Sequence, residues 1–343
     1  MNEDFIFREI ESGFITEIDG QMYQLLSATF DEQAVKGILP TLTKEGEFAW
    51  AFGCVVYSLP PVGRIVPSIN LTVSLRNTAT NITSDRVIQL HSIPNASQLS
   101  TDLYSITEKK GITILSNRVL WSQDQSYLQN FVETGVRLRD ESILILDLRG
   151  HGGGNDGYAA QWVSQYTGQP SIGGGMFAGN VLMSKTVGQL SQWATTMSPP
   201  QWRLREHVSL PTIQNENLVI VLTDNAIGST GDAFVGMLRQ LENVLFVGTN
   251  TSGTLVTGNV ASVPLPYSRT NVAFGTHLNI LPDLSPFEGV GFAPDLWVAP
   301  DASLERVLLF AKNLGFTITR AETDATASVR GVRRILSRLR TLR

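Results

Sequence analysis

Ser229 stands where a nucleophile would stand if this chain performed covalent catalysis. It follows an apolar run over residues 218–224 and precedes a stretch of helical spacing over residues 233–241, with glycines close by on both sides. A sharp turn between a strand and a helix lifts a hydroxyl clear of the sheet and brings the next backbone N–H near an incoming carbonyl. The alternative is that Ser229 only caps the helix, with Asp232 in its first turn.

A second turn, rich in glycine, is a candidate oxyanion hole. An Ile- and Leu-rich run ends at Asp147, and residues 150–155 then read Gly-His-Gly-Gly-Gly-Asn before a helical stretch at 158–166. Such a turn directs backbone N–H groups toward whatever lies above the end of the strand. Two alternatives are a phosphate cradle, although the Gly-Lys-Ser/Thr of a P-loop is missing, and a plain connection without chemistry.

The elements that must position both turns form an α/β layer. Apolar runs at 142–147, 218–224 and 244–248 have the composition of strands buried on both faces. Residues 122–138 fit an amphipathic helix, and residues 302–314 also read as helical. Two strand–turn–helix units followed by another strand predict a parallel sheet.

Residues 1–93 read as a β-rich module. Residues 14–21 resemble a strand that ends in an Asp-Gly turn, and residues 69–76 alternate like a half-buried strand with 86–91 as its partner. Residues 30–42 have helical spacing. The strand and turn at 15–21 and the strand at 71–76 are similar to parts of a PDZ-like module, of which this chain would hold only a part.

Composition places limits on the function. The 343 residues are 42% hydrophobic and 17% charged, as in a globular protein with a sizeable core, and the net charge of −5 argues against a general nucleic-acid binder. The lone cysteine, Cys54, lies in an apolar context and has no partner for a disulfide within the chain. No apolar run reaches the roughly 18 residues of a membrane helix. No signal peptide is visible at the N-terminus.

Three ordered motifs resemble those of the S41 peptidases. They are Asp-Leu-Arg-Gly-His-Gly-Gly at 147–153, Ser-Thr-Gly-Asp at 229–232 and Gly-x-x-Pro-Asp at 291–295. That family includes the C-terminal processing (tail-specific) proteases, the tricorn core protease and the interphotoreceptor retinoid-binding protein repeats. The resemblance implies Ser229 as the nucleophile, with the N–H groups of Gly153 and Thr230 as the oxyanion hole.

The same resemblance implies an architecture. It covers roughly residues 110–312 and predicts an S41 protease core of ClpP/crotonase-like layered β-sheets with helices, preceded by the partial PDZ-like module. We therefore divide the chain into the N-terminal module at 1–93, the peptidase core at 94–318 and a basic C-terminal tail at 319–343.

The general base is where this sequence departs from the family. The processing proteases use a Ser–Lys dyad whose lysine follows a glycine, and here Gly253 is followed by Thr254. A threonine cannot act as the base. Lys185, within a long irregular insertion at 168–212 that reads as a lid or substrate wall, is a weak substitute.

The tricorn-like branch, which we favour, uses a histidine instead. That histidine precedes the PDZ module, and a glutamate lies just before the Gly-x-x-Pro-Asp motif, where Glu288 stands in this chain. Glu288 is otherwise a surface carboxylate. His151 replaces the asparagine usual in the glycine motif and is a candidate substitute base, with a turn-shaping role as its alternative. The other histidines, at 91, 207 and 277, are expected to be structural or exposed.

Together these observations predict a serine-type endopeptidase that hydrolyses unstructured polypeptides or C-terminal tails through an acyl-enzyme on Ser229. The main alternative is a binding or scaffold protein of the same fold that has lost its general base. An α/β esterase is disfavoured because no Asp…His pair follows the serine. No metal or other cofactor is implied, and the expected partner is a polypeptide rather than nucleic acid.

The sequence leaves the oligomeric state open. Family resemblance favours a location outside the cytoplasm. The tail at 330–343 carries six arginines among apolar residues, which is typical of a basic amphipathic helix. It could contact a membrane or an acidic partner, with a solvated terminal helix as the alternative.

Overall fold

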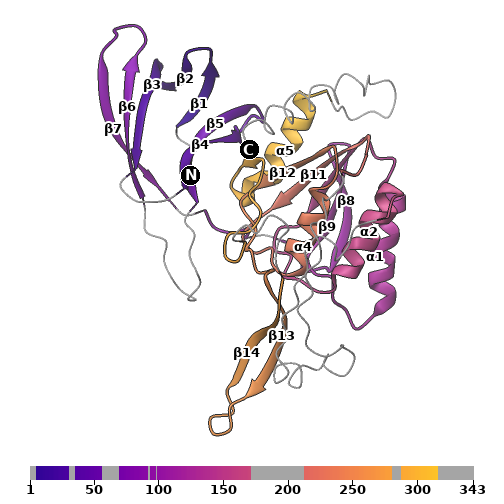
Figure 1. Ribbon diagram of the computed structural model, residues 1–343. Helices are drawn as coiled ribbons and strands as arrows, with labels where there is room; N and C mark the ends of the chain where they lie inside the picture. The colour runs from indigo at the N-terminus through magenta and orange to yellow at the C-terminus, as the bar shows by residue number, and fades with distance from the viewer. Residues whose placement is uncertain are drawn as a thin grey trace.

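The described part of the chain contains two sheets, the helices that cover one of them and a projecting hairpin (Figure 1). The computed structural model describes residues 5–30, 35–55, 69–91, 93–97, 99–170, 212–279 and 287–315. The predicted tail at 319–343, most of the insertion, and with it Lys185 and His207, lie outside these residues.

The second sheet in the chain carries the two turns. Its strand order is β15-β12-β11-β10-β9-β8, parallel throughout except that β8 pairs with β9 in the antiparallel sense. The bounds are β8 (Tyr104–Lys109), β9 (Ile112–Asn117), β10 (Ile143–Asp147), β11 (Leu218–Thr223), β12 (Val244–Gly248) and β15 (Leu296–Trp297). Every residue of β10, β11 and β12 is buried, which confirms the three predicted buried runs.

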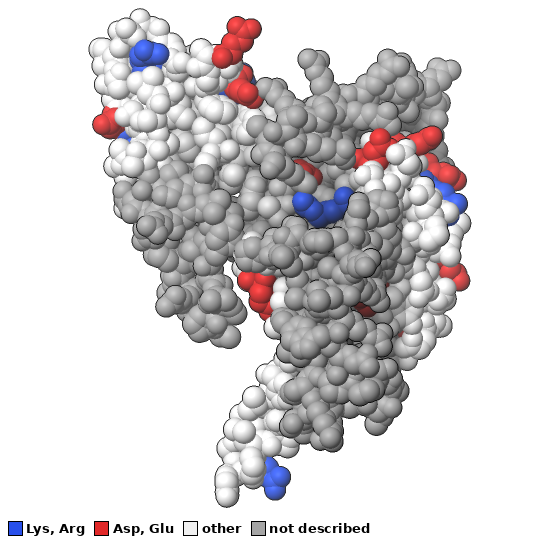
Figure 2. Space-filling model, viewed as in Figure 1, with Lys and Arg blue, Asp and Glu red and all other residues white. Residues whose placement is uncertain are grey.

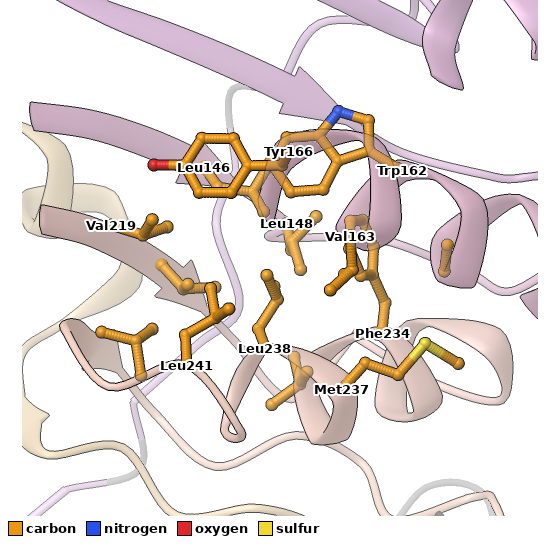
Figure 3. Packing of buried hydrophobic residues seen from close by; sticks show 14 of the residues in the cluster. Leu146, Leu148, Trp162, Val163, Tyr166, Val219, Phe234, Met237, Leu238 and Leu241 are labelled. Atoms are coloured by element: carbon orange, nitrogen blue, oxygen red, sulfur yellow. The ribbon is translucent and has the colours of Figure 1, made fainter. Parts of the chain in front are cut away.

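Helices cover both faces of this sheet. The bounds are α1 (Gln125–Leu138), α2 (Asp156–Thr167), α4 (Thr230–Leu238) and α5 (Pro300–Asn313). Side chains from α1, α2 and α4 pack with alternate strand residues such as Leu144 and Leu146, and Figure 3 shows Trp162, Tyr166 and Phe234 from these helices in that core. The other alternate residues, such as Ile143 and Ile145, pack with α5. The predicted α/β layer is therefore confirmed.

The N-terminal sheet has seven antiparallel strands in the order β4-β5-β1-β2-β3-β6-β7. The bounds are β1 (Ile6–Ile10), β2 (Gly13–Ile18), β3 (Gln21–Phe30), β4 (Val35–Leu42), β5 (Phe48–Val55), β6 (Ile69–Asn77) and β7 (Thr83–Leu90). The predicted Asp-Gly turn joins β2 to β3, with positive φ at Asp19 and Gly20. The pairing of β6 with β7 was also predicted. The PDZ-like character of this module stays a prediction.

The helical spacing of residues 30–42 was misleading. Val35–Leu42 forms β4, an edge strand paired with β5 from end to end. Apolar residues at 38, 39 and 42 fit both a helical and a strand period, so periodicity alone cannot decide. Pro40 is tolerated on an edge strand and would break a helix interior.

The end of β4 joins the N-terminal sheet to the second sheet. Leu42 is fully buried in the same cluster as Ile112 and Phe310. Thr41 Oγ1 donates to Trp297 O at 2.5 Å, and Arg306 Nη1 donates to Leu42 O at 2.8 Å. The two sheets therefore share buried surface at this seam, and a domain division at residue 93 stays a prediction.

A hairpin of β13 (Thr257–Pro264) and β14 (Asn271–Leu278) projects from the body beside the turn that follows β12 (Figure 1). On the face drawn in Figure 2, acidic and basic side chains of the described residues are interspersed. None of the described helices is long and apolar enough to cross a membrane.

Leu42→Ala tests the seam between the sheets. Leu42 is fully buried, so truncation should lower the free energy of unfolding by about 2–5 kcal/mol through lost burial and a cavity. Leu26→Ala is the control, because Leu26 is 45% exposed and its truncation should cost less than about 0.5 kcal/mol. Urea denaturation measures both, and equal costs for the two variants would contradict the described seam.

Candidate active site

Ser229 occupies a strained turn between β11 and α4. Its backbone has φ +53° and ψ −118°, a region that a non-glycine residue enters at a cost of about 1–3 kcal/mol. The flanking glycines permit close approach: a Cβ on Gly228 would come within 2.6 Å of Thr254 Oγ1, and one on Gly231 within 2.7 Å of His151 O. This is the geometry of a nucleophile elbow.

The Ser229 hydroxyl is not used as a helix cap. Ser229 stands at the N-cap position of α4, but its side chain makes no capping hydrogen bond. The residue is exposed. The capping interpretation is therefore wrong, and Ser229 is an exposed residue beyond the carboxyl end of β11.

The glycine turn after β10 is anchored by a buried ion network. Asp147 accepts hydrogen bonds from Arg149 Nη2 at 2.7 Å and Arg118 Nη2 at 2.9 Å. Burial alone would raise the pKa of Asp147, but the hydrogen bonds and charges of Arg149 and Arg118 outweigh it and hold that pKa below its usual value. Arg149 Nη1 also donates to Pro300 O at 2.6 Å, which ties the turn to the start of α5.

A second buried carboxylate links the two turns. Asp224 Oδ1 accepts the N–H of Gly150 at 2.9 Å and that of Ala226 at 3.2 Å. Gly228 N–H donates to His151 O at 3.0 Å, and Thr230 Oγ1 donates to Gly154 O at 2.7 Å. The turn after β10 and the turn after β11 are thus locked together.

This locking brings the predicted oxyanion residues beside Ser229. A Cβ on Gly153 would lie 3.2 Å from Ser229 Cβ and 3.5 Å from Ser229 Oγ, so Gly153 leaves the space next to the hydroxyl open. Thr230 N–H, at the first position of α4, has no acceptor among the described residues. Gly153 N–H, by contrast, donates to His151 Nδ1 at 3.2 Å.

His151 is placed as a structural residue of the turn. Its side chain is fully buried, and Nδ1 already accepts the Gly153 N–H. Burial lowers the pKa of His151 to about 4, and the charge of Arg118 acts in the same direction. These features argue against the predicted role as general base.

Thr254 contacts the backbone of Ser229. Its Oγ1 accepts the Ser229 N–H at 3.0 Å and lies 3.0 Å from Ser252 Oγ. Asp232, buried in the first turn of α4, accepts the N–H groups of Gly253 at 3.3 Å and Thr254 at 2.9 Å. Asp232 thereby holds the Thr254 loop against the elbow.

Glu288 contacts the residues that follow Thr254. Its carboxylate accepts the N–H of Val256 at 3.1 Å and the hydroxyl of Thr257 at 2.5 Å, and so fastens the start of β13. Among the described residues, no titratable side chain is hydrogen-bonded to Ser229 Oγ. His91 is exposed, and His277 lies in β14.

Two residues of this site escaped the sequence analysis. Arg118 follows β9 and was not singled out, yet its Nη1 donates to Asp147 O at 2.8 Å and to Arg149 O at 2.9 Å. Asp224 was assigned only to the end of a strand. Within the part of the chain that the structure describes, no group of three His, Cys, Asp or Glu side chains is placed to hold a metal ion.

Asp232 should give the stability a pH dependence. Burial raises its pKa to about 6, against the opposing hydrogen bonds from Thr251, Thr254 and Gly253. The folded protein therefore binds a proton between about pH 4 and 6 that the unfolded chain has lost. Relative to Asp232→Asn, the free energy of unfolding of the wild type should fall by about 2.5 kcal/mol as the pH rises from about 4 to 7, since one pKa unit corresponds to about 1.4 kcal/mol.

Urea denaturation at several pH values measures this difference. Asp140→Asn is the control: Asp140 is exposed, and this variant should follow the wild type across the range. If the wild type gained stability relative to Asp232→Asn as the pH rose, the assigned environment of Asp232 would be incorrect.

Comparison with known proteins identifies one family. Residues 112–298 match the model of peptidase family S41. No curated protein matches the chain.

Several solved structures are similar at low identity. A putative peptidase from Parabacteroides merdae is 20% identical, with 61% of this chain and 64% of that chain covered and a TM-score of 0.39. The photosystem II D1 C-terminal processing protease is 16% identical, with 76% and 61% covered and a TM-score of 0.36. Mature CPAF is 15% identical, with 91% and 80% covered and a TM-score of 0.39. The match thus spans less than two thirds of the first two structures.

Proposed function

Because this chain belongs to peptidase family S41, whose model covers more than half of its length, we propose that it hydrolyses peptide bonds with Ser229 as the nucleophile. The observation that carries the proposal is the conformation of Ser229: its backbone is strained at φ +53°, the residue is exposed, and its side chain makes no capping hydrogen bond to α4. A strained backbone at a solvent-facing serine costs stability and is retained where it positions a reacting group.

In the proposed reaction, Ser229 Oγ attacks the carbonyl carbon of the scissile peptide and loses its proton to a base. The tetrahedral oxyanion accepts a hydrogen bond from the N–H of Thr230. This N–H has no acceptor among the described residues and stands at the positive end of the α4 dipole. The amine product leaves with a proton, and water hydrolyses the acyl-enzyme in a second step. Unstructured polypeptides or C-terminal tails are the proposed substrates, because an extended chain can enter an exposed site of this kind.

The base is proposed to come from a part of the chain or of a larger assembly outside the described residues. Two carboxylates that hold the Thr254 loop have other partners: Asp232 accepts the N–H groups of Gly253 and Thr254, and Glu288 accepts the N–H of Val256. Glu288 fits the proposed role of orienting a histidine, since it already lies beside the turn at 254–257.

One observation favours a second candidate function. The hydroxyl of Thr254 accepts a hydrogen bond from the backbone N–H of Ser229. In a Ser–Lys dyad, a lysine amine beside the serine would instead accept the proton of the serine hydroxyl. A chain with this substitution and no base from elsewhere would bind polypeptides without cleaving them. The two candidates differ in whether Ser229 is activated.

A fluorophosphonate probe tests activation of Ser229 directly. Wild-type protein at about pH 8 should be labelled, and Ser229→Ala should lose all labelling because the attacking oxygen is gone. Ser252→Ala is the matched control, because it removes a neighbouring hydroxyl that lies 3.0 Å from Thr254 Oγ1. This variant should still be labelled at Ser229. Equal labelling of wild type and Ser229→Ala would overturn the proposed nucleophile.

Thr254→Lys tests the second candidate. A lysine here supplies an amine beside Ser229 and should raise the labelling rate by about 10²-fold, the lower end of what general-base assistance provides. Thr254→Met removes the hydroxyl without adding a base, so its labelling rate should equal that of the wild type or be lower. If wild type were unlabelled and Thr254→Lys reactive, the binding function would be favoured over peptidase activity.

A further inference from the structure

The peptide group that joins Gly152 to Gly153 is held on one side only. The N–H of this peptide group, which belongs to Gly153, donates to His151 Nδ1 at 3.2 Å. Its carbonyl, Gly152 O, accepts no hydrogen bond from the described residues. The groups on either side are fixed: Gly152 N–H donates to Arg118 O at 3.0 Å, and Gly153 O accepts from Leu120 N at 2.9 Å. The 152–153 peptide is therefore a short unit between two anchored neighbours, with a single hydrogen bond setting its orientation.

Both residues that flank this peptide permit it to rotate. A peptide unit turns when ψ of the residue before it and φ of the residue after it change in opposite senses, which leaves the neighbouring chain nearly in place. Gly153 already has φ +122°, and a Cβ at Gly152 would meet nothing within 4 Å. Because both residues are glycines, neither dihedral angle is limited by a side chain.

His151 offers the peptide N–H a weak and isolated acceptor. For Nδ1 to accept, the ring proton must sit on Nε2, and Nε2 is buried without a partner in the described residues. The contact with Gly153 thus selects a tautomer with an unsatisfied N–H. An oxyanion at Ser229 carries charge and would compete well for the same donor, since charge-assisted hydrogen bonds are the stronger ones.

We propose that His151 is a positioning residue that holds the Gly153 N–H in a resting orientation, and that a developing oxyanion on Ser229 draws this N–H away by rotation of the 152–153 peptide. This inference rests on the proposed function, because it takes Ser229 as the nucleophile. Gly153 is close enough for the exchange, since a Cβ there would lie 3.5 Å from Ser229 Oγ. The donor is then paired in both states and binds more strongly in the transition state, which is the condition for it to aid catalysis.

Amide hydrogen exchange in protein labelled with ¹⁵N-glycine tests the resting contact without any need for activity. His151→Phe keeps a buried ring and removes the acceptor, so the exchange rate of the Gly153 amide should rise at least about fivefold. The Gly152 and Gly157 amides serve as internal controls, because they donate to Arg118 O and Asn155 Oδ1 and should keep their rates. His151→Asn, which restores an acceptor oxygen, should return the Gly153 rate toward wild type.

Two outcomes of this experiment would overturn the inference. One is an unchanged Gly153 rate in His151→Phe, and the other is a parallel rise at Gly152 and Gly157, which would mean that His151 only supports the packing of the turn. His151→Leu is the second acceptor-free variant if the Phe variant does not fold. Repeating the measurement in Ser229→Ala separates this result from the identity of the nucleophile.

Fluorophosphonate labelling supplies the second readout. Removal of the competing acceptor in His151→Phe should raise the labelling rate about fivefold, and His151→Asn should return it toward wild type. A fall in that rate, with faster Gly153 exchange, would mean that His151 assists the donor instead of holding it back, and would overturn the inference. Absence of labelling in every variant, Thr254→Lys included, would be a failure of the proposed function, and the exchange rates would still decide the resting contact.

Discussion

The buried carboxylate of Asp147 determines where the backbone goes after β10. Two arginines reach it from different directions, Arg149 from the turn itself and Arg118 from the loop after β9. Arg118 Nη1 also donates to two backbone carbonyls of the turn, and Arg118 O accepts the Gly152 N–H. Hydrogen bonds to the remaining groups decide how stable a buried ion pair is, and here Arg118 Nη1 and Arg149 Nη1 donate to backbone carbonyls of the turn and of Pro300. The position of Gly153 beside Ser229 therefore depends on the ion pairs that Asp147 makes at the end of β10.

The two halves of the site differ in how complete they are. The half that would stabilise negative charge is assembled from backbone, with Thr230 N–H available at the start of α4 and Gly153 N–H close by. In the half that would move protons, none of the described titratable side chains is hydrogen-bonded to Ser229 Oγ, and the hydroxyl of Thr254 accepts the Ser229 N–H. Backbone geometry depends on the packing of many residues, whereas a base depends on one side chain. A single substitution can therefore change the second half and leave the first intact.

Much of the core could be predicted from the sequence, because strands buried on both faces leave short, unbroken apolar runs rich in Ile, Leu and Val. The runs that became β10, β11 and β12 and the amphipathic pattern of α1 belong to this class. Residues 30–42 could not be assigned in the same way, since their apolar spacing fits two periods and only pairing with β5 decides. Contacts between side chains that lie far apart in the sequence are still harder to predict. Nothing local to Arg118 indicates Asp147, and nothing local to Thr254 indicates the Ser229 N–H, because each depends on how strands are ordered in the sheet.

The hydrogen bond from Gln169 Nε2 to Gln214 O, at 3.3 Å, lies where the chain leaves α2 and returns toward β11. The two ends of the intervening segment are thus held close together by residues of the core. Under that condition the entropy of closing a loop grows only slowly with its length, by roughly 0.6 kcal/mol for each doubling. A change in the length of the connection between Gln169 and Gln214 should therefore cost the α/β layer little stability.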